Sequence, residues 1–273
     1  MFVDFMGFFR KVSQIMIAEM LNAERIQSVI EPDNRFYLSG IEIFDSIDST
    51  NTYLLKKAKE NVASGLVCLA EEQTQGRGRL GKSWHSPHGA NIYCSMLWRF
   101  KNTAQDISGL GIAVGVMVVN ALHRYGVPSG LQLKWPNDVL WKDRKLSGIL
   151  LEKNELSSVV IGIGLNLSIE QANEKNWVDL SELMGQSIKR NFLIGLLLDE
   201  ILKNMQQFEN HGLAPYLSEW QQYDALLNKN IIIVTPEKKI SGMMRGINNM
   251  GELLLETEKG IQGFRYGEVS VIK

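Results

Sequence analysis

The residues best suited to carry chemistry form a glycine and arginine loop, QTQGRGRLG at 73–81. Its glycines satisfy the G-x-G-x-x-G spacing of dinucleotide sites, but no helical pattern follows and no acidic residue stands about 20 positions on. The stretch Gly76–Ser83 also satisfies the P-loop spacing G-x-x-x-x-G-K-S, but KSWHSPHGAN after Gly81 is not the helical pattern that a P-loop requires. What remains is a loop whose backbone amides and two arginines, Arg77 and Arg79, can approach a carboxylate or phosphate. A solvated basic loop is the alternative, and this stretch alone leaves both open.

A second group of polar residues follows at 134–148. In KWPND at 134–138, Pro136 interrupts an apolar strand and would present Asn137 and Asp138 at a strand end, where base edges or a metal could be met. Lys145 lies near the start of another apolar strand, where it either extends to solvent or points into a site. The segment STN at 49–51 is compatible with an ordinary helix N-cap.

Apolar patterns predict the elements that must hold these residues. Helical periodicity covers residues 10–30 and about 50–60, 107–125 and 190–210, and strands are expected between them. From residue 230 onward IIIVT, KISGMMRGI, ELLLET and EVSVIK are short strands separated by turn signals. They predict a small antiparallel barrel beyond a boundary near residue 226. The mixed elements before it predict an α+β domain.

Composition sets limits on function but does not choose one. The chain has 273 residues and a formal net charge of -1, so no field of the whole chain would attract nucleic acid or anionic lipid. Cys68 and Cys94 lie in apolar surroundings and are expected to be buried, reduced thiols, which favours a cytoplasmic protein. No run reaches the roughly 20 apolar residues of a membrane span. His85 and His88 lack a third ligand at a set spacing, so no metal site is predicted.

Taken together, five ordered motifs resemble the bacterial biotin–protein ligases. They are STN at 49–51, QTQGRGRLG at 73–81, KWPND at 134–138, RKLSGIL at 144–150 and IGIGLN at 161–166. The resemblance runs from about Leu21 to Lys273. It implies an α+β fold with a mixed-sheet catalytic domain of the biotin/lipoate-ligase type over 41–226 and a small SH3-like β-barrel over 227–273. Residues 1–40 are expected to be a helical segment without a complete winged helix.

The family's reaction is implied in the same way. Biotin would attack the α-phosphate of ATP to give biotinyl-5'-AMP, with Mg²⁺ accompanying the pyrophosphate. A lysine of the biotin carboxyl carrier protein of acetyl-CoA carboxylase would then take the biotinyl group. Reaction between anions requires cations around the reacting groups. The resemblance implies that Lys145, Arg77 and Arg79 are these catalytic residues.

The resemblance also implies two overlapping sets of binding residues. The biotin-binding residues would be Ser49, Thr50, Asn51, Gln73, Gly76, Arg77, Gly78, Arg79, Lys145, Gly148 and Gly162. The ATP-binding residues would be Arg79, Trp84, Lys134, Asn137, Lys145 and Asn166. Trp84 would stack on adenine, and Gly162 would leave room for the bicyclic ring of biotin. Ser147 departs from the usual glycine or alanine, but its side chain is small.

Three other functions compete with this interpretation. A bifunctional ligase and biotin-operon repressor would need a winged helix-turn-helix, and the residues before the first catalytic strand are too few, so no specific DNA binding is expected. A lipoate–protein ligase shares the fold, but KWPND and GRGRLG favour biotin. A non-enzymatic biotin-binding module would not need Lys145 and both arginines. The protein is expected to be a monomer or a weak homodimer.

Overall fold

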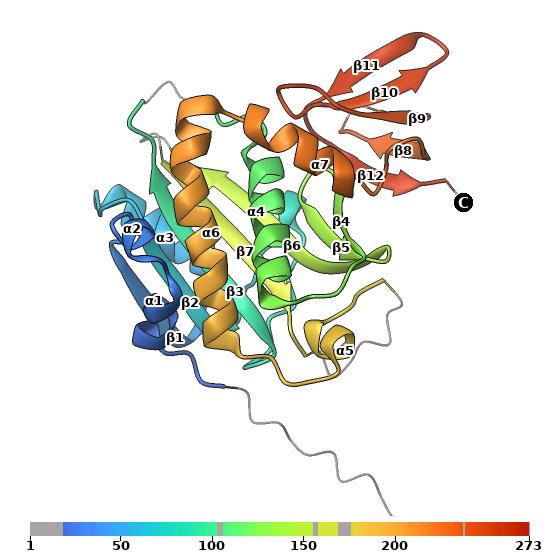
Figure 1. The fold of residues 1–273 in the computed structure, drawn as a ribbon. Helices are drawn as coiled ribbons and strands as arrows, with labels where there is room; N and C mark the ends of the chain where they lie inside the picture. Colours follow the sequence, from blue (N-terminus) through green and yellow to red (C-terminus); the bar gives the residue numbers. More distant parts are fainter. Residues whose placement is uncertain (1–18, 103–105, 155–157, 169–175, 237, 273) are drawn as a thin grey trace, which may run out of the picture.

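The structure is a computed structural model that describes residues 19–102, 106–154, 158–168, 176–236 and 238–272. Figure 1 shows a large mixed sheet with helices packed on it, followed by a smaller antiparallel sheet at the C-terminal end. This is the α+β architecture that the sequence predicted. The part of the predicted N-terminal helix that precedes residue 19 lies outside the described residues. None of the described helices is long and apolar enough to cross a membrane.

The large sheet has the strand order β1-β2-β3-β7-β6-β5-β4, with β1 parallel to β2 and the other neighbouring pairs antiparallel. Its strands are β1 (Gly40–Ile47), β2 (Leu66–Gln73), β3 (Asn91–Arg99), β4 (Leu131–Lys134), β5 (Asp138–Trp141), β6 (Arg144–Lys153) and β7 (Ser158–Asn166). The central strands β3 and β7 are buried along nearly their whole length. Their continuous apolar runs suit strands that are covered on both faces.

Helices cover both faces of this sheet. On one face α4 (Leu110–Tyr125) and α6 (Arg190–His211) pack side by side (Figure 1). On the other, α3 (Thr50–Lys59) packs against β2, β3 and β7. Val67 contacts the core under α4 and α6, whereas the next residue, Cys68, contacts the core under α3, since successive strand residues point to opposite faces. The shorter helices are α1 (Ala23–Val29), α2 (Pro32–Arg35), α5 (Leu180–Met184) and α7 (Leu217–Tyr223).

The C-terminal sheet has the order β11-β10-β9-β8-β12 and is antiparallel throughout. Its strands are β8 (Asn230–Val234), β9 (Lys239–Ile247), β10 (Leu253–Thr257), β11 (Gly260–Phe264) and β12 (Glu268–Val271). The sequence predicted four of them and missed β11. Its two glycines and Gln262 leave no alternation of apolar and polar residues. This sheet rests on the large domain, where the indole Nε1 of Trp135 donates to the carbonyl oxygen of Gly251 at 3.0 Å.

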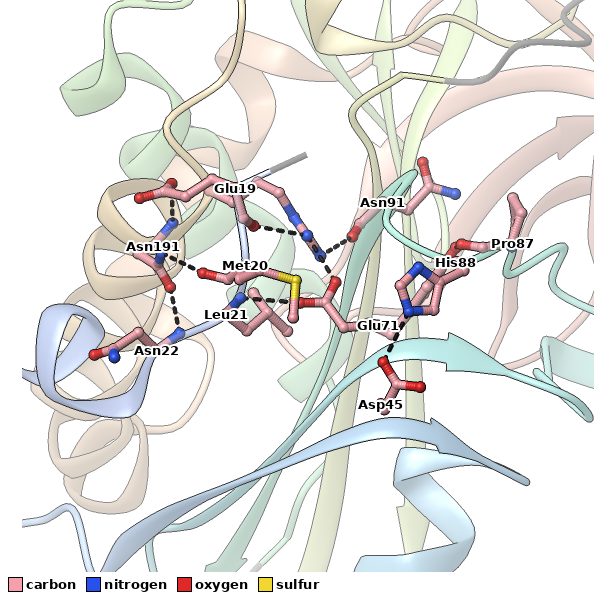
Figure 2. Close-up of polar contacts among 12 residues, drawn as sticks. Glu19, Met20, Leu21, Asn22, Asp45, Glu71, Pro87, His88, Asn91 and Asn191 are labelled. Carbon is pink, nitrogen blue, oxygen red and sulfur yellow. Dashed lines mark hydrogen bonds and ion pairs between the residues drawn. The ribbon is translucent and has the colours of Figure 1, made fainter. Parts of the chain in front are cut away.

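A buried ion pair fastens the start of the described chain to the sheet. Glu71 of β2 and Arg190 of α6 lie 2.7 Å apart, and each side chain is 3% exposed. Glu71 also accepts a hydrogen bond from the backbone of Leu21, while Arg190 donates to the carbonyl oxygens of Glu19 and Asn91 (Figure 2). Backbone groups therefore supply much of the hydrogen bonding that a buried charge pair requires, while Nε of Arg190 is buried without a partner. We call these five residues the N-terminal anchor.

The two cysteines lie in the core, as predicted. Cys68 on β2 and Cys94 on β3 are buried and form no disulfide. Burial raises the pKa of the Cys94 thiol to about 12, so the thiol stays protonated at neutral pH. Neither thiol has the character of a nucleophile.

Candidate active site

Nearly all the predicted site residues meet around one cavity of about 440 Å³. It opens between β6 and β7, the start of α3, the glycine and arginine loop, the β4–β5 turn and strand β12 of the C-terminal sheet. Those that line it are Ser49, Thr50, Asn51, Gln73, Arg77, Gly78, Arg79, Trp84, Lys134, Asn137, Lys145, Gly148 and Gly162. Gly76 and Asn166 do not line it. The cavity has an uncharged polar end and a cationic end.

The uncharged end is a chain of hydrogen bonds at the start of α3. The backbone N–H and the hydroxyl of Thr50 lie 2.9 and 3.1 Å from Oε1 of Gln73. Ser95 of β3 lies between Thr50 and Asn51, with its Oγ 2.7 Å from Thr50 Oγ1 and 2.6 Å from Asn51 Oδ1. Ser49 caps α3 by accepting from the backbone of Thr52. Buried polar groups held in this way can form an ordered set of partners for a polar, uncharged ring.

The glycine and arginine loop is a narrow turn that returns on itself. The backbone of Trp84 donates to the carbonyl oxygen of Gly76 at 2.9 Å, and Arg77 and Ser83 form an isolated β-bridge. A Cβ atom on Gly76 would come within 2.4 Å of Trp84 O and Ser86 Oγ. Only glycine allows Trp84 and Ser86 to approach the backbone at position 76 so closely. Gly76 therefore shapes the loop without lining the cavity.

Each arginine of the loop points to a different partner. Arg77 Nη2 lies 2.6 Å from Glu152 Oε2 on β6. Arg79 Nη1 donates to Oδ1 of Asn137 at 3.1 Å, and burial lowers the pKa of the Arg79 guanidinium. An arginine stays charged even then, so both cations are available to an anion in the cavity.

Lys145 faces Asp138 across the paired strands β5 and β6. The distance from Lys145 Nζ to Asp138 Oδ1 is 2.7 Å, and the two side chains are 28% and 22% exposed. The ammonium also lies 5.3 Å from the centre of the Trp84 ring. The pair is reachable from the cavity, so an incoming anion can compete with Asp138 for the lysine.

Comparison with known proteins places this geometry in a family. Residues 43–166 match the biotin/lipoate A/B protein ligase family, and residues 226–271 match the biotin protein ligase C-terminal domain. The bifunctional ligase/repressor BirA of Escherichia coli is 36% identical over 93% of this chain and 78% of its own length. The chain belongs to the biotin protein ligase family.

Two further relatives agree with that membership. The biotin–[acetyl-CoA-carboxylase] ligase of Paracoccus denitrificans is 31% identical over 81% of this chain and 96% of its own length. Among solved structures, the biotin protein ligase of Aquifex aeolicus in complex with biotin and ATP has a TM-score of 0.75 and 28% identity. It covers 86% of this chain and 100% of that one.

Two residues predicted to contact ligand in this biotin protein ligase, Asn166 and Gly162, also stabilise the fold. Asn166 is buried, and its Nδ2 donates to the carbonyl oxygens of Lys145 and Val178 at 3.2 and 3.1 Å. A Cβ atom on Gly162 would lie 2.2 Å from Asn51 Oδ1. Gly162 therefore makes room for Asn51 directly, and any contact with biotin stays a prediction.

Several cavity residues of this family member have no counterpart in the sequence prediction. They are Lys82, Ser83, Cys94, Ser95, Trp135, Pro136, Asp138, Ile149, Leu150, Ile163, Gly164, Trp177 and Glu268–Ser270. Trp84 lies against Gly164, where a Cβ atom would come within 2.4 Å of its ring. Lys82 reaches Glu268 of the C-terminal sheet at 2.5 Å, so both domains close the cavity. Three of them carried a sequence signal: Lys82 as a cation of the glycine and arginine loop, and Pro136 and Asp138 through the KWPND motif at a strand end.

His88, one of the two histidines considered as zinc ligands, is paired with a carboxylate. His88 Nε2 lies 2.9 Å from Asp45 Oδ1, and both side chains are exposed. Among the described residues, no group of three or more His, Cys, Asp or Glu side chains is placed to hold a metal ion.

Proposed function

We propose that this biotin protein ligase activates biotin with ATP and transfers it to a lysine of a biotin carboxyl carrier domain. One observation carries the proposal: Lys145, Arg77 and Arg79 converge on a cavity whose other end is the uncharged chain from Asn51 to Gln73. Such a cavity suits a ligand with a polar ring at one end and a carboxylate at the other. The relatives' names supply the chemistry, since the ligases of Paracoccus and Mycobacterium are named for acetyl-CoA carboxylase.

The first step joins two anions. A carboxylate oxygen of biotin bonds to the α-phosphorus of ATP, and the bond to the leaving pyrophosphate breaks, giving biotinyl-5'-AMP. Negative charge gathers on the phosphoryl oxygens, so nearby fixed cations lower the barrier. Lys145 and the two loop arginines fill this role. Ligand phosphate would replace Asp138 as the partner of Lys145.

The second step transfers the acyl group. The neutral amine of an acceptor lysine attacks the carbonyl carbon of the mixed anhydride, AMP leaves with the electron pair of the C–O bond, and the nitrogen loses a proton. Water must be excluded until the acceptor arrives. The glycine and arginine loop supplies that cover, and Lys82 ties it to Glu268 of the C-terminal sheet.

The assignment of residues is part of the proposal. The ring of biotin would meet Ser49, Thr50, Asn51, Gln73, Gly148 and Gly162, and Gly76–Arg79 would cover it. The nucleotide would contact Arg79, Trp84, Lys134, Asn137 and Lys145. Asn166 would support this set through its hydrogen bond to the backbone of Lys145. The proposed division of the chain into 1–40, 41–226 and 227–273 is supported by the end of α7 at Tyr223 and the start of β8 at Asn230.

Magnesium would enter with the nucleotide. Mg²⁺ is usually held by substrate phosphates and one or two carboxylates. Asp138 fits this pattern, because its carboxylate lines the cavity and would be released when ligand phosphate takes its place beside Lys145. The ion would neutralise charge on the phosphates. We place the reaction in the cytoplasm, where ATP is available and thiols such as Cys68 and Cys94 stay reduced.

The test is a reaction with purified components. The protein is incubated with ATP, Mg²⁺, biotin and a biotin carboxyl carrier domain, with lipoate replacing biotin in a parallel reaction. We expect pyrophosphate release and biotinylated carrier with biotin only. Transfer of lipoate, or no adenylate with either acid, would overturn the proposal.

A further inference from the structure

Glu152 lies on β6 beneath the glycine and arginine loop and is not among the residues that line the ligand cavity. One of its carboxylate atoms, Oε2, lies 2.6 Å from Nη2 of Arg77 and 2.9 Å from Nδ2 of Asn51. The side chain is 23% exposed. A single oxygen thus joins two cavity residues that come from separate elements, the loop and the start of α3.

The charge of Glu152 sets the direction of the hydrogen bonds at the uncharged end of the cavity. An ionised carboxylate only accepts, so Asn51 must present its amide NH₂ to Glu152. The amide oxygen of Asn51 then faces Ser95 Oγ at 2.6 Å and requires a proton from it. Gly162 lies against this amide, where even a methyl group would come 2.2 Å from Asn51 Oδ1, so the amide has little room to reorient.

The Glu152 carboxylate also holds the glycine and arginine loop against β6, through Arg77. A hollow of about 360 Å³ separates the loop from β6, and its lining runs from Arg77 to Lys82 and from Leu150 to Glu152. The loop is therefore held by individual contacts instead of a packed interface. Arg77 makes the contact to Glu152, while Arg79 and Lys82 reach Asn137 and Glu268.

We propose that Glu152 is a positioning residue for biotin: its carboxylate holds Arg77 over the cavity and orients the Asn51 amide that begins the chain of ring-binding hydrogen bonds. This inference rests on the proposed function. It names a residue that acts through its neighbours and does not touch ligand. Arg77 and Asn51 both belong to the predicted biotin-binding set and neither belongs to the ATP-binding set, so the effect of Glu152 falls on biotin binding more than on ATP binding.

The first experiment changes the charge and preserves the shape. Glu152→Gln should raise the KM for biotin about tenfold, the cost of one charged hydrogen bond in a partly exposed site, with the KM for ATP nearly unchanged. Glu256→Gln is the matched control, because Glu256 also lies 2.6 Å from an arginine, Arg245, whose exposure of 39% resembles the 40% of Arg77. The control should leave every constant unchanged.

The second experiment reverses the hydrogen bond. Asn51→Asp places two acceptors against each other and should weaken biotin binding more than Glu152→Gln does. Combining Asn51→Asp with Glu152→Gln restores a donor and an acceptor, with the donor now at position 152. The double variant should therefore bind biotin better than Asn51→Asp alone.

The outcomes separate the inference from the function on which it rests. A wild-type protein that makes no biotinyl-5'-AMP would count against the proposed function before any variant is measured. An active wild type whose Glu152→Gln variant keeps its KM for biotin, or raises both KM values equally, would overturn the positioning role. A double variant no better than Asn51→Asp would overturn the orienting part of it. Thermal unfolding of each variant checks that the fold is intact.

Discussion

The N-terminal anchor and the ligand cavity lie two residues apart on β2, at Glu71 and Gln73, yet they hold their charges in opposite ways. In the anchor the paired side chains are 3% exposed and are hydrogen-bonded to backbone groups. In the cavity Arg77 and Lys145 are 40% and 28% exposed and are paired with the side chains of Glu152 and Asp138, not with backbone. Exposure and the nature of the partner thus separate a charge that supports the fold from one that serves a reaction.

The largest effect on stability is expected in the anchor. Arg190→Met keeps most of the side-chain volume but leaves Glu71 buried without its partner, which costs about 3–5 kcal/mol of unfolding free energy. Urea denaturation measures the loss. Arg245→Met removes an exposed ion pair and is the control, with an expected change of about 0–1 kcal/mol. Equal losses in the two variants would remove the distinction between anchor and surface charges.

The converse is expected at Lys145. Lys145→Ala should leave the unfolding free energy nearly unchanged, because the Lys145–Asp138 pair is partly exposed. Adenylate formation should slow by about 10²–10³-fold, since a cation next to the developing phosphoryl charge is removed. Single-turnover pyrophosphate release reports the rate. A folded variant that releases pyrophosphate at the wild-type rate would place Lys145 outside the chemistry.

A smaller effect is expected from the loop. Arg79→Gly removes the hydrogen bond to Asn137, a contact of a charged group worth about 1.5–3 kcal/mol. The adenylate should still form but escape more readily, so lysines of an unrelated protein such as serum albumin become biotinylated. Labelling confined to the carrier domain, as with wild type, would show that Arg79 does not hold the loop closed.

The sequence predicted the cavity better than the anchor, for a physical reason. Loop and turn residues such as Arg77 and Asn137 stand out because glycine and proline interrupt apolar strands beside them. Ser95 does not, because it lies in a continuous buried strand and only the register with β7 shows which face it occupies. In the sequence, Glu152 is one of the polar residues that end a strand, and nothing there indicates its contacts. Trp177 belongs to no periodic pattern, so its place in the cavity could not be predicted.

The anchor depends on contacts between distant parts of the chain. Glu71 and Arg190 are 119 residues apart in sequence, and neither carries a local signal. The predicted helix over residues 10–30 differs from the structure in a related way. Within the described residues only Ala23–Val29 form a helix there, capped by Asn22, whose side chain accepts from Arg25 N–H. Residues 19–22 are not helical. There the Leu21 N–H donates to Glu71 and the Met20 carbonyl oxygen accepts from Asn191, so tertiary hydrogen bonds outweigh helical periodicity.

The smallest effect is expected at an ion pair beside the anchor, between His88 and Asp45 (Figure 2). The hydrogen bond to Asp45 raises the pKa of His88. Because the folded pKa lies above the unfolded value of about 6.5, the pair stabilises the protein fully below that pH and loses its effect as the pH rises through the folded pKa. Side chains that are 51% and 79% exposed are well screened, so the contribution is at most about 1 kcal/mol.

Asp45→Asn tests this pair directly. The NMR titration of the His88 ring should show a lower pKa in the variant, and urea denaturation at about pH 5.5 should show a small loss of stability that vanishes at about pH 8.5. An effect as large as that of Arg190→Met would mean that exposure does not decide what a charge contributes in this protein. A His88 pKa that does not move would show that Asp45 is not its partner in solution.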